Sequence, residues 1–281
     1  MRALLVGWFS FEGMGATAGD LLAADLARSW LTDAGVDVAV AWAPPFSATV
    51  DWRQVDPEDV DAVVFVCGPF GNGPPLQELL HHFRTCRLIG LDVTMLEPLQ
   101  TWNPFDLLIE RDSSRRANPD LALAGAAEDV PVVGMVLMRE QPEYGERDRH
   151  RDVNERLEAL VANPGFTRVS IDTRLDVSGS LLRTPTEVTS LLARMDVVLT
   201  SRLHGLVLAL RGGVPVVAVD PVAGGAKVTR QAAALEWPWC FGADVPFEQL
   251  AEAFAACRSP EGRAAASAAR RRALEVIDDL R

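Results

Sequence analysis

The sequence is almost free of lysine and has a deficit of basic charge. Of its 27 basic residues only Lys227 is a lysine, and 39 acidic residues give a formal net charge of −12. A nucleic-acid-binding protein needs a basic surface for the phosphates, so this balance argues against a nucleic-acid partner. Any anionic ligand must be held by a few local cations inside a repulsive overall field. Arginines in turns, and the one lysine, are therefore candidate binding residues.

Cysteines and long apolar runs are also scarce. The 4 cysteines show no C-x-x-C spacing, and Cys67 and Cys240 lie in apolar stretches, which predicts reduced thiols packed in a core. A membrane-spanning helix needs about 18 apolar residues, and Arg211 and Gly212 interrupt the best candidate. The first residues do not resemble a signal peptide. We therefore expect a cytoplasmic protein without an integral membrane segment.

Short apolar runs alternate with helical patterns along the chain, and the alternation restarts after residue 128. Strands are predicted at 3–7, 36–43, 62–67, 88–91 and 107–109, then at 130–138, 168–171, 197–200 and 215–219. Helices are predicted at 20–34, 74–83, 148–162, 184–194, 203–211, 247–257 and 263–280. Apolar strands alternating with helices are typical of a parallel sheet covered on both faces. The sequence thus predicts an α/β fold of two doubly wound, Rossmann-like halves facing a cleft, residues 1–128 and 129–281.

The segment 197–220 is the most informative for chemistry, because a strand runs through a short polar turn directly into a helix. Ser201 is predicted to cap that helix, and the free N–H groups at its start, from Leu203 on, form an anion site. Arg202 offers a planar fork of donors to a carboxylate or phosphate. His204 is a candidate acid–base catalyst, because an imidazole can both give and take a proton under physiological conditions. A purely structural interpretation explains this segment, taken alone, equally well: the serine caps the helix and the histidine packs against the sheet.

The string from Thr200 to Val219, with Arg-Leu-His, an apolar helix, Gly-Val-Pro and a strand, closely resembles the C-terminal signature of the polysaccharide pyruvyltransferase family. Lys227 fits the lysine that the family carries after this strand. Weaker similarities are Gly19-Asp20, Cys67-Gly-Pro-Phe-Gly71, Arg111-Asp-Ser-Ser114 and the strand 132–139, which ends in an arginine.

Two departures from the family pattern lie in the first half. Gly15-Ala-Thr-Ala18 stands where the family has an asparagine before Gly-Asp, and Leu91-Asp-Val93 replaces a glycine-rich stretch. The first half is expected to face the acceptor, so these differences leave the acceptor open.

The resemblance implies a two-domain fold similar to GT-B glycosyltransferases, with the acceptor side in the first half and the donor side in the second. It implies transfer of the pyruvyl group of phosphoenolpyruvate onto two hydroxyls of a sugar or glycan as a ketal, with release of phosphate. Phosphoenolpyruvate is then a co-substrate, and neither a cofactor nor a metal is expected. A homo-oligomer is left open.

Donor binding requires positive groups for a carboxylate and a phosphate. The resemblance assigns these to Arg202, Lys227 and Arg139, together with the helix start at Ser201 and Leu203. Arg183, just before a predicted helix, is a further candidate.

Catalysis requires an acid that protonates C3 of the donor, a role that fits His204. Asp20 could act as the base for the acceptor hydroxyl, although an acid at that position also fits an ordinary helix start.

Two alternative functions stay open. One is a GT-B-like glycosyltransferase with a nucleotide-sugar donor, and the other is a non-catalytic sugar-binding relative. The glycines at 13, 15 and 19 lack the G-x-G-x-x-G spacing of a dinucleotide site. His81 and His82 are adjacent and cannot share one helix face, so they do not predict a metal site.

Overall fold

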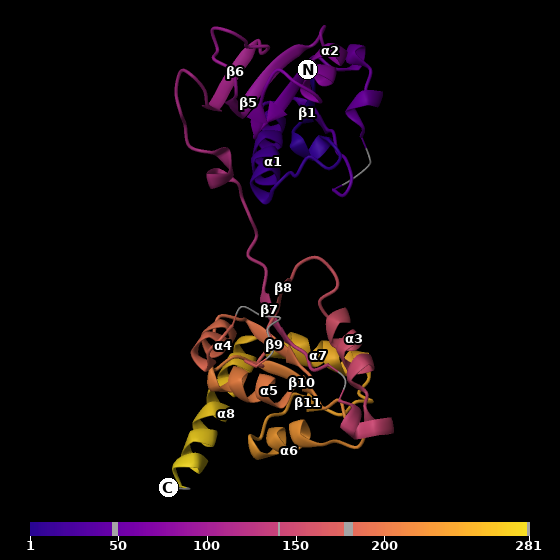
Figure 1. Ribbon diagram of the computed structural model, residues 1–281, viewed down its shortest axis with the longest axis vertical. Coiled ribbons are helices and arrows are strands. Elements are labelled where there is room, and N and C mark those ends of the chain that lie inside the picture. The colour runs from indigo at the N-terminus through magenta and orange to yellow at the C-terminus, as the bar shows by residue number, and fades with distance from the viewer. Residues whose placement is uncertain (47–49, 140, 177–181, 280–281) are drawn as a thin grey trace. The chain divides into compact units, whose positions relative to one another are not determined.

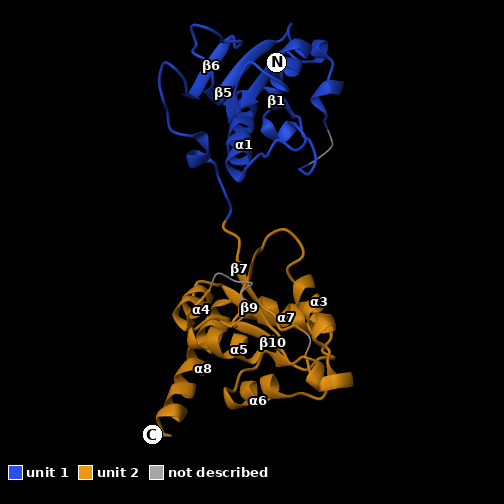
Figure 2. Ribbon diagram, viewed as in Figure 1, with its two compact units in different colours: residues 1–128 blue, residues 129–281 orange. Residues whose placement is uncertain are grey.

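The computed structural model describes residues 1–46, 50–139, 141–176 and 182–279 (Figure 1). The chain divides into two compact units, residues 1–128 and residues 129–281 (Figure 2). Each unit has its own parallel sheet, so the predicted α/β class with two doubly wound halves is confirmed. Within the described residues, no helix combines the length and the apolar character needed to cross a membrane.

Unit 1 is built on a 6-stranded sheet in the order β2-β1-β3-β5-β4, with β6 paired to β5. Its strands are β1 (Arg2–Val6), β2 (Asp37–Val40), β3 (Ala62–Val66), β4 (Pro69–Phe70), β5 (Arg87–Met95) and β6 (Leu107–Asp112). Its helices are α1 (Ala18–Asp33) and α2 (Leu76–His82), with short 3-10 turns η1 (Trp8–Ser10), η2 (Trp52–Gln54), η3 (Pro57–Asp59) and η4 (Leu121–Ala124).

Two apolar clusters cover the two faces of this sheet. Leu4 and Phe65 pack with Leu79 of α2 on one face, whereas Leu5 and Val64 pack with α1 on the other. Successive strand residues point to opposite faces, so a run without polar residues is what a sheet buried on both sides requires.

Unit 2 is built on a 5-stranded parallel sheet in the order β11-β10-β9-β7-β8. Its strands are β7 (Val132–Val136), β8 (Thr167–Ser170), β9 (Val197–Thr200), β10 (Val216–Val219) and β11 (Cys240–Phe241). Its helices are η5 (Pro142–Arg147), α3 (His150–Ala159), α4 (Pro185–Leu192), α5 (Leu203–Arg211), α6 (Lys227–Ala234), α7 (Phe247–Cys257) and α8 (Pro260–Asp278). The central strands β9 and β10 are buried along their whole length.

Besides the 3-10 helices, three elements were not predicted from the sequence pattern. The strands β4 and β11 have only two residues each, too few to show a period. Helix α6 follows the Gly224-Gly225 turn, and this glycine-rich sequence gives no signal for the start of a helix. The prediction that Pro74 and Pro75 belong to the first turn of α2 is wrong, because Pro75 is the N-cap and Leu76 the first helical residue.

Candidate functional site

A cavity of about 210 Å³ lies in unit 2 at the carboxyl ends of β9 and β10. It is lined by Met138, Gln141, Ser201, Arg202, Leu203, His204, Asp220, Pro221, Val222, Lys227 and Val228. The carboxyl ends of strands are where doubly wound sheets bind ligands. The structure therefore brings five of the predicted site residues together in one place.

The turn after β9 is fixed by Thr200, whose side chain is fully buried. Its Oγ1 donates to the carbonyl oxygen of Val136 at 2.7 Å and accepts from the N–H of Arg202 at 2.9 Å. A Cβ on Gly205 would lie 2.1 Å from Thr200 Oγ1 and 2.9 Å from Val136 Cγ1. Only a glycine lets the first turn of α5 pack this closely against the strand ends.

The prediction that Ser201 caps α5 is wrong. The N-cap is Arg202, and within the described residues no side chain caps this helix. The Ser201 hydroxyl instead donates to Asn154 Oδ1 at 2.7 Å and accepts from the N–H of Met138 at 2.9 Å. Asn154 Nδ2 also donates to the carbonyl oxygen of Met138 at 2.8 Å. Sequence reasoning missed Asn154, because it lies inside α3 without any motif around it.

Arg202 is held in place by a carboxylate. Its side chain is 14% exposed, and its Nη1 donates to Oδ1 of Asp172 at 2.7 Å. Asp172 follows β8, at the same edge of the sheet. His204, in the first turn of α5, is exposed and lines the cavity. The guanidinium is thus fixed in one orientation beside a solvent-accessible imidazole.

Lys227 is the first residue of α6, and a buried carboxylate shapes the turn before it. Asp220 is fully buried. Its Oδ2 accepts from the N–H groups of Ala226 and Thr229 at 2.7 and 2.9 Å and from Thr229 Oγ1 at 3.0 Å. The negative charge of Asp220 therefore compensates the N-terminal dipole of α6.

Helix α5 starts beside the same cavity without such a carboxylate cap among the described residues. Because a helix N-terminus favours negative charge, an anion in the cavity is drawn to α5 rather than to α6.

The remaining predicted residues lie elsewhere. Arg139 and Arg183 are exposed and do not line the cavity. The backbone N–H of Arg183 donates to Glu187 Oε2 at 2.6 Å, within the capping box of α4. Asp20 belongs to unit 1, where its Oδ2 accepts from both the N–H and the hydroxyl of Thr17 at 2.7 Å. This capping box favours the structural interpretation of Asp20, and its role as a base stays a prediction.

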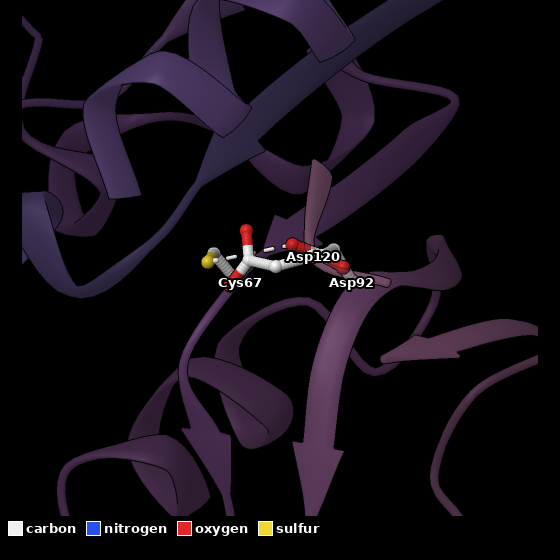
Figure 3. A group of neighbouring side chains, drawn as sticks. All are labelled: Cys67, Asp92 and Asp120. Atoms are coloured by element: carbon white, nitrogen blue, oxygen red, sulfur yellow. Dashed lines mark hydrogen bonds between the residues drawn. The ribbon is translucent and has the colours of Figure 1, made fainter. Parts of the chain in front are cut away.

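Unit 1 has its own polar group beside the end of β3, formed by Cys67, Asp92 of β5 and Asp120 at the start of η4 (Figure 3). Cys67 and Asp92 are buried, and both have positive φ angles of 66° and 59°. The Cys67 thiol donates to Asp92 Oδ2 at 3.6 Å, and Asp120 Oδ2 accepts from Arg111 Nη1 at 2.8 Å. The ligand atoms of Cys67, Asp92 and Asp120 lie within 4.8 Å of one another, which raises the question of a metal site.

The chemistry of this group fits a hydrogen-bonded network better than a metal site. Burial, and then the nearby carboxylates of Asp20, Asp92 and Asp120, raise the pKa of the Cys67 thiol to about 12. Metals bind the thiolate, and without a metal the thiol keeps the proton that it donates to Asp92. Arg111 already supplies positive charge to the group. We interpret it as a connection between β3, β5 and η4.

Comparison with a family model gives a match in unit 2. Residues 132–221 match the family model described as polysaccharide pyruvyl transferase, which confirms the predicted resemblance over this segment. The curated proteins give no match. Among solved structures, the chain is similar to the glycotransferase of kitacinnamycin, with 13% identity over 99% of this chain and 98% of that one and a TM-score of 0.34. It is also similar to the spinosyn rhamnosyltransferase SpnG, with 13% identity over 96% and 95% of the two chains and a TM-score of 0.37.

Proposed function

We propose that this protein transfers the pyruvyl group of phosphoenolpyruvate to two hydroxyls of a sugar or glycan, forming a cyclic ketal and releasing phosphate. The observation that carries the proposal is the cavity of unit 2, in which Arg202, His204 and Lys227 meet the N-terminus of α5. Every residue of this cavity except Val222, Lys227 and Val228 lies inside the segment that matches the pyruvyltransferase family model.

The donor is a small molecule with a carboxylate and a phosphate, and the cavity offers a partner for each. Arg202 can bind a carboxylate through a planar edge of its guanidinium, which Asp172 holds in place. The phosphate fits between the N–H groups at the start of α5 and the ammonium of Lys227. In a chain with a net charge of −12, these local cations make the cavity a suitable place for an anion.

His204 has the position needed for proton transfer. In the proposed reaction, its imidazolium donates a proton to C3 of the donor, so that C2 becomes electrophilic. The first acceptor hydroxyl forms a bond to C2 and gives up its proton. The bond between C2 and the phosphate oxygen then breaks, and phosphate leaves with the electron pair. The second hydroxyl bonds to C2 and closes the ketal. Of the two protons released by the hydroxyls, one returns to the imidazole and the other goes to the phosphate.

A panel of ligands tests the donor. A ligand that binds only the folded state raises the apparent melting temperature by mass action. At constant ionic strength, phosphoenolpyruvate should stabilise the wild-type protein, while nucleoside diphosphates and inorganic sulfate should have a much smaller effect. Stabilisation by a nucleoside diphosphate without any effect of phosphoenolpyruvate would contradict the proposal and favour a nucleotide-sugar donor.

A further inference from the structure

Unit 2 contains a buried histidine that the proposed reaction does not use. His150, the first residue of α3, is 1% exposed. Its Nδ1 lies 2.6 Å from Asp148 Oδ1, and among the described residues its Nε2 has no hydrogen-bond partner. The network therefore assigns the proton to Nδ1, which donates to the carboxylate. A buried polar pair without a role in the core calls for an explanation, since burying it costs free energy.

Asp148 connects this histidine to the wall of the cavity. Its Oδ1 also accepts from the N–H of His150 at 2.9 Å, and its Oδ2 accepts from the N–H of Gln141 at 2.7 Å. Burial raises the pKa of Asp148, but the hydrogen bonds from His150 and Gln141 outweigh it and lower the pKa. The charged carboxylate of Asp148 thus holds the two ends of the loop together, Gln141 at one end and the start of α3 at the other.

This loop contacts the turn that precedes Lys227. Asp148 forms an antiparallel bridge with Val222, flanked by hydrogen bonds of 2.9 Å from Arg149 N–H to the Pro221 carbonyl and from Ala223 N–H to the Arg147 carbonyl. The bridge joins the loop to the backbone of the glycine-rich turn.

Two side chains of the same loop extend the contact to the lysine itself. The guanidinium of Arg147 donates to the carbonyls of Ala223 and Gly225 at 2.9 and 3.2 Å. Gln141 Oε1 accepts from Lys227 Nζ at 3.3 Å. Both Gln141 and Lys227 line the cavity, whereas His150 does not.

We propose that Asp148, oriented by the buried His150, is a positioning residue that fixes Gln141 and Arg147 against the turn 223–227 and so places Lys227 in the cavity. The identity of the anion that Lys227 binds, phosphoenolpyruvate, rests on the proposed function. The positioning of Lys227 does not. His150 and Asp148 act through the loop and touch no substrate.

The single lysine makes this positioning measurable without any ligand. Protein grown on lysine labelled with ¹³C at Cε alone gives one side-chain signal, from Lys227. In His150→Asn the amide nitrogen stands near the place of Nδ1 and can still donate to Asp148, whereas in His150→Gln it stands near the place of Nε2. We expect the Lys227 signal of His150→Asn to match the wild type and that of His150→Gln to shift and narrow, because the lysine is released. Identical signals in all three proteins would overturn the proposal.

Binding of phosphoenolpyruvate gives the second readout. Losing one hydrogen bond to a charged group should weaken binding about three- to tenfold in His150→Gln, and His150→Asn should restore it. If the positioning acts through Lys227, His150→Gln should add nothing in a Lys227→Ala background. Fully additive effects would show that His150 only stabilises the fold and would overturn the proposal.

Two further variants keep the test decisive. Arg151→Gln, an exposed change on the same helix, should leave both readouts unchanged. Should His150→Gln fail to fold, Asp148→Asn replaces it, with the same shift of the lysine signal expected. If wild-type protein does not bind phosphoenolpyruvate but the lysine signal shifts as expected, the proposed donor is wrong and the positioning holds.

Discussion

The two units have similar sheets but opposite chemistry at one edge. In unit 2, Arg202, His204 and Lys227 line a cavity beside the start of α5. In unit 1, the edge beside the end of β3 carries Asp92 and Asp120, together with the Cys67 thiol and Arg111. The side chains at these edges, rather than the sheets, decide the charge. The proposed trianionic donor would meet cations at the edge of unit 2 and carboxylates at the edge of unit 1, while the acceptor role of unit 1 stays a prediction.

The largest expected effect tests whether unit 2 supplies the catalyst. Removing a positioned acid–base group typically costs about 10²–10⁴ in rate, so His204→Ala should lose at least about a hundredfold in phosphate release while still binding phosphoenolpyruvate. His81→Ala, which removes an exposed histidine of unit 1, is the matched control and should keep wild-type turnover. Turnover of folded His204→Ala within a few-fold of wild type would place the acid elsewhere.

A second prediction concerns the structural role of the carboxylates in unit 1. Glu110 is 1% exposed and accepts hydrogen bonds from Ser113, Arg115 and Arg116. Burial raises its pKa, but its backbone hydrogen bond and these partners outweigh burial and lower the pKa to about 2. Since the folded pKa lies below that of the unfolded chain, the ionised form stabilises the fold above about pH 4.5 and the gain is lost as the pH falls toward 2.

Because its partners Arg115 and Arg116 are 55% and 52% exposed and screened by solvent, this contribution is on the order of 1–3 kcal/mol at neutral pH. Denaturant unfolding of the wild type and Glu110→Gln should therefore differ most above pH 5, and the difference should shrink steadily below it. A difference that does not depend on pH would show that the interactions of Glu110 are not electrostatic.

Several features of the fold could be read directly from the sequence, and others could not. The strand at 197–200 and the helix at 203–211 were predicted with the bounds that the structure has, because the strand is an uninterrupted apolar run and the apolar stretch of the helix stops at Gly212. The roles of Asn154, Asp172 and Asp148 could not be predicted, because they depend on which strand ends lie side by side. Ser201 illustrates the limit: serine before a helix suggests a cap, but its hydroxyl is bound to α3.

The close packing behind the cavity gives a third prediction. Gly205→Ala would place a methyl group against Thr200, which should cost about 2 kcal/mol of unfolding free energy through overpacking. Gly242→Ala is the control, because a Cβ there meets nothing within 4 Å. Equal melting temperatures for the two variants would show that α5 does not depend on this close approach.

The smallest expected effect distinguishes the charge of Arg202 from the planar geometry of its guanidinium. Arg202→Lys keeps the positive charge but loses the planar fork, so phosphoenolpyruvate should bind about tenfold more weakly. Arg211→Lys, an exposed change at the other end of α5, should not alter the affinity. Calorimetric titration measures both, and equal affinities would make Arg202 a purely structural residue paired with Asp172.

The most direct test of the contrast between the two edges is a crystal structure with phosphoenolpyruvate. We predict that the ligand lies in the cavity of unit 2, with its carboxylate on Arg202 and its phosphate between the start of α5 and Lys227. Phosphoenolpyruvate bound instead beside Asp92 and Asp120 of unit 1, or a cavity that stays free of it at saturating concentration, would contradict this prediction.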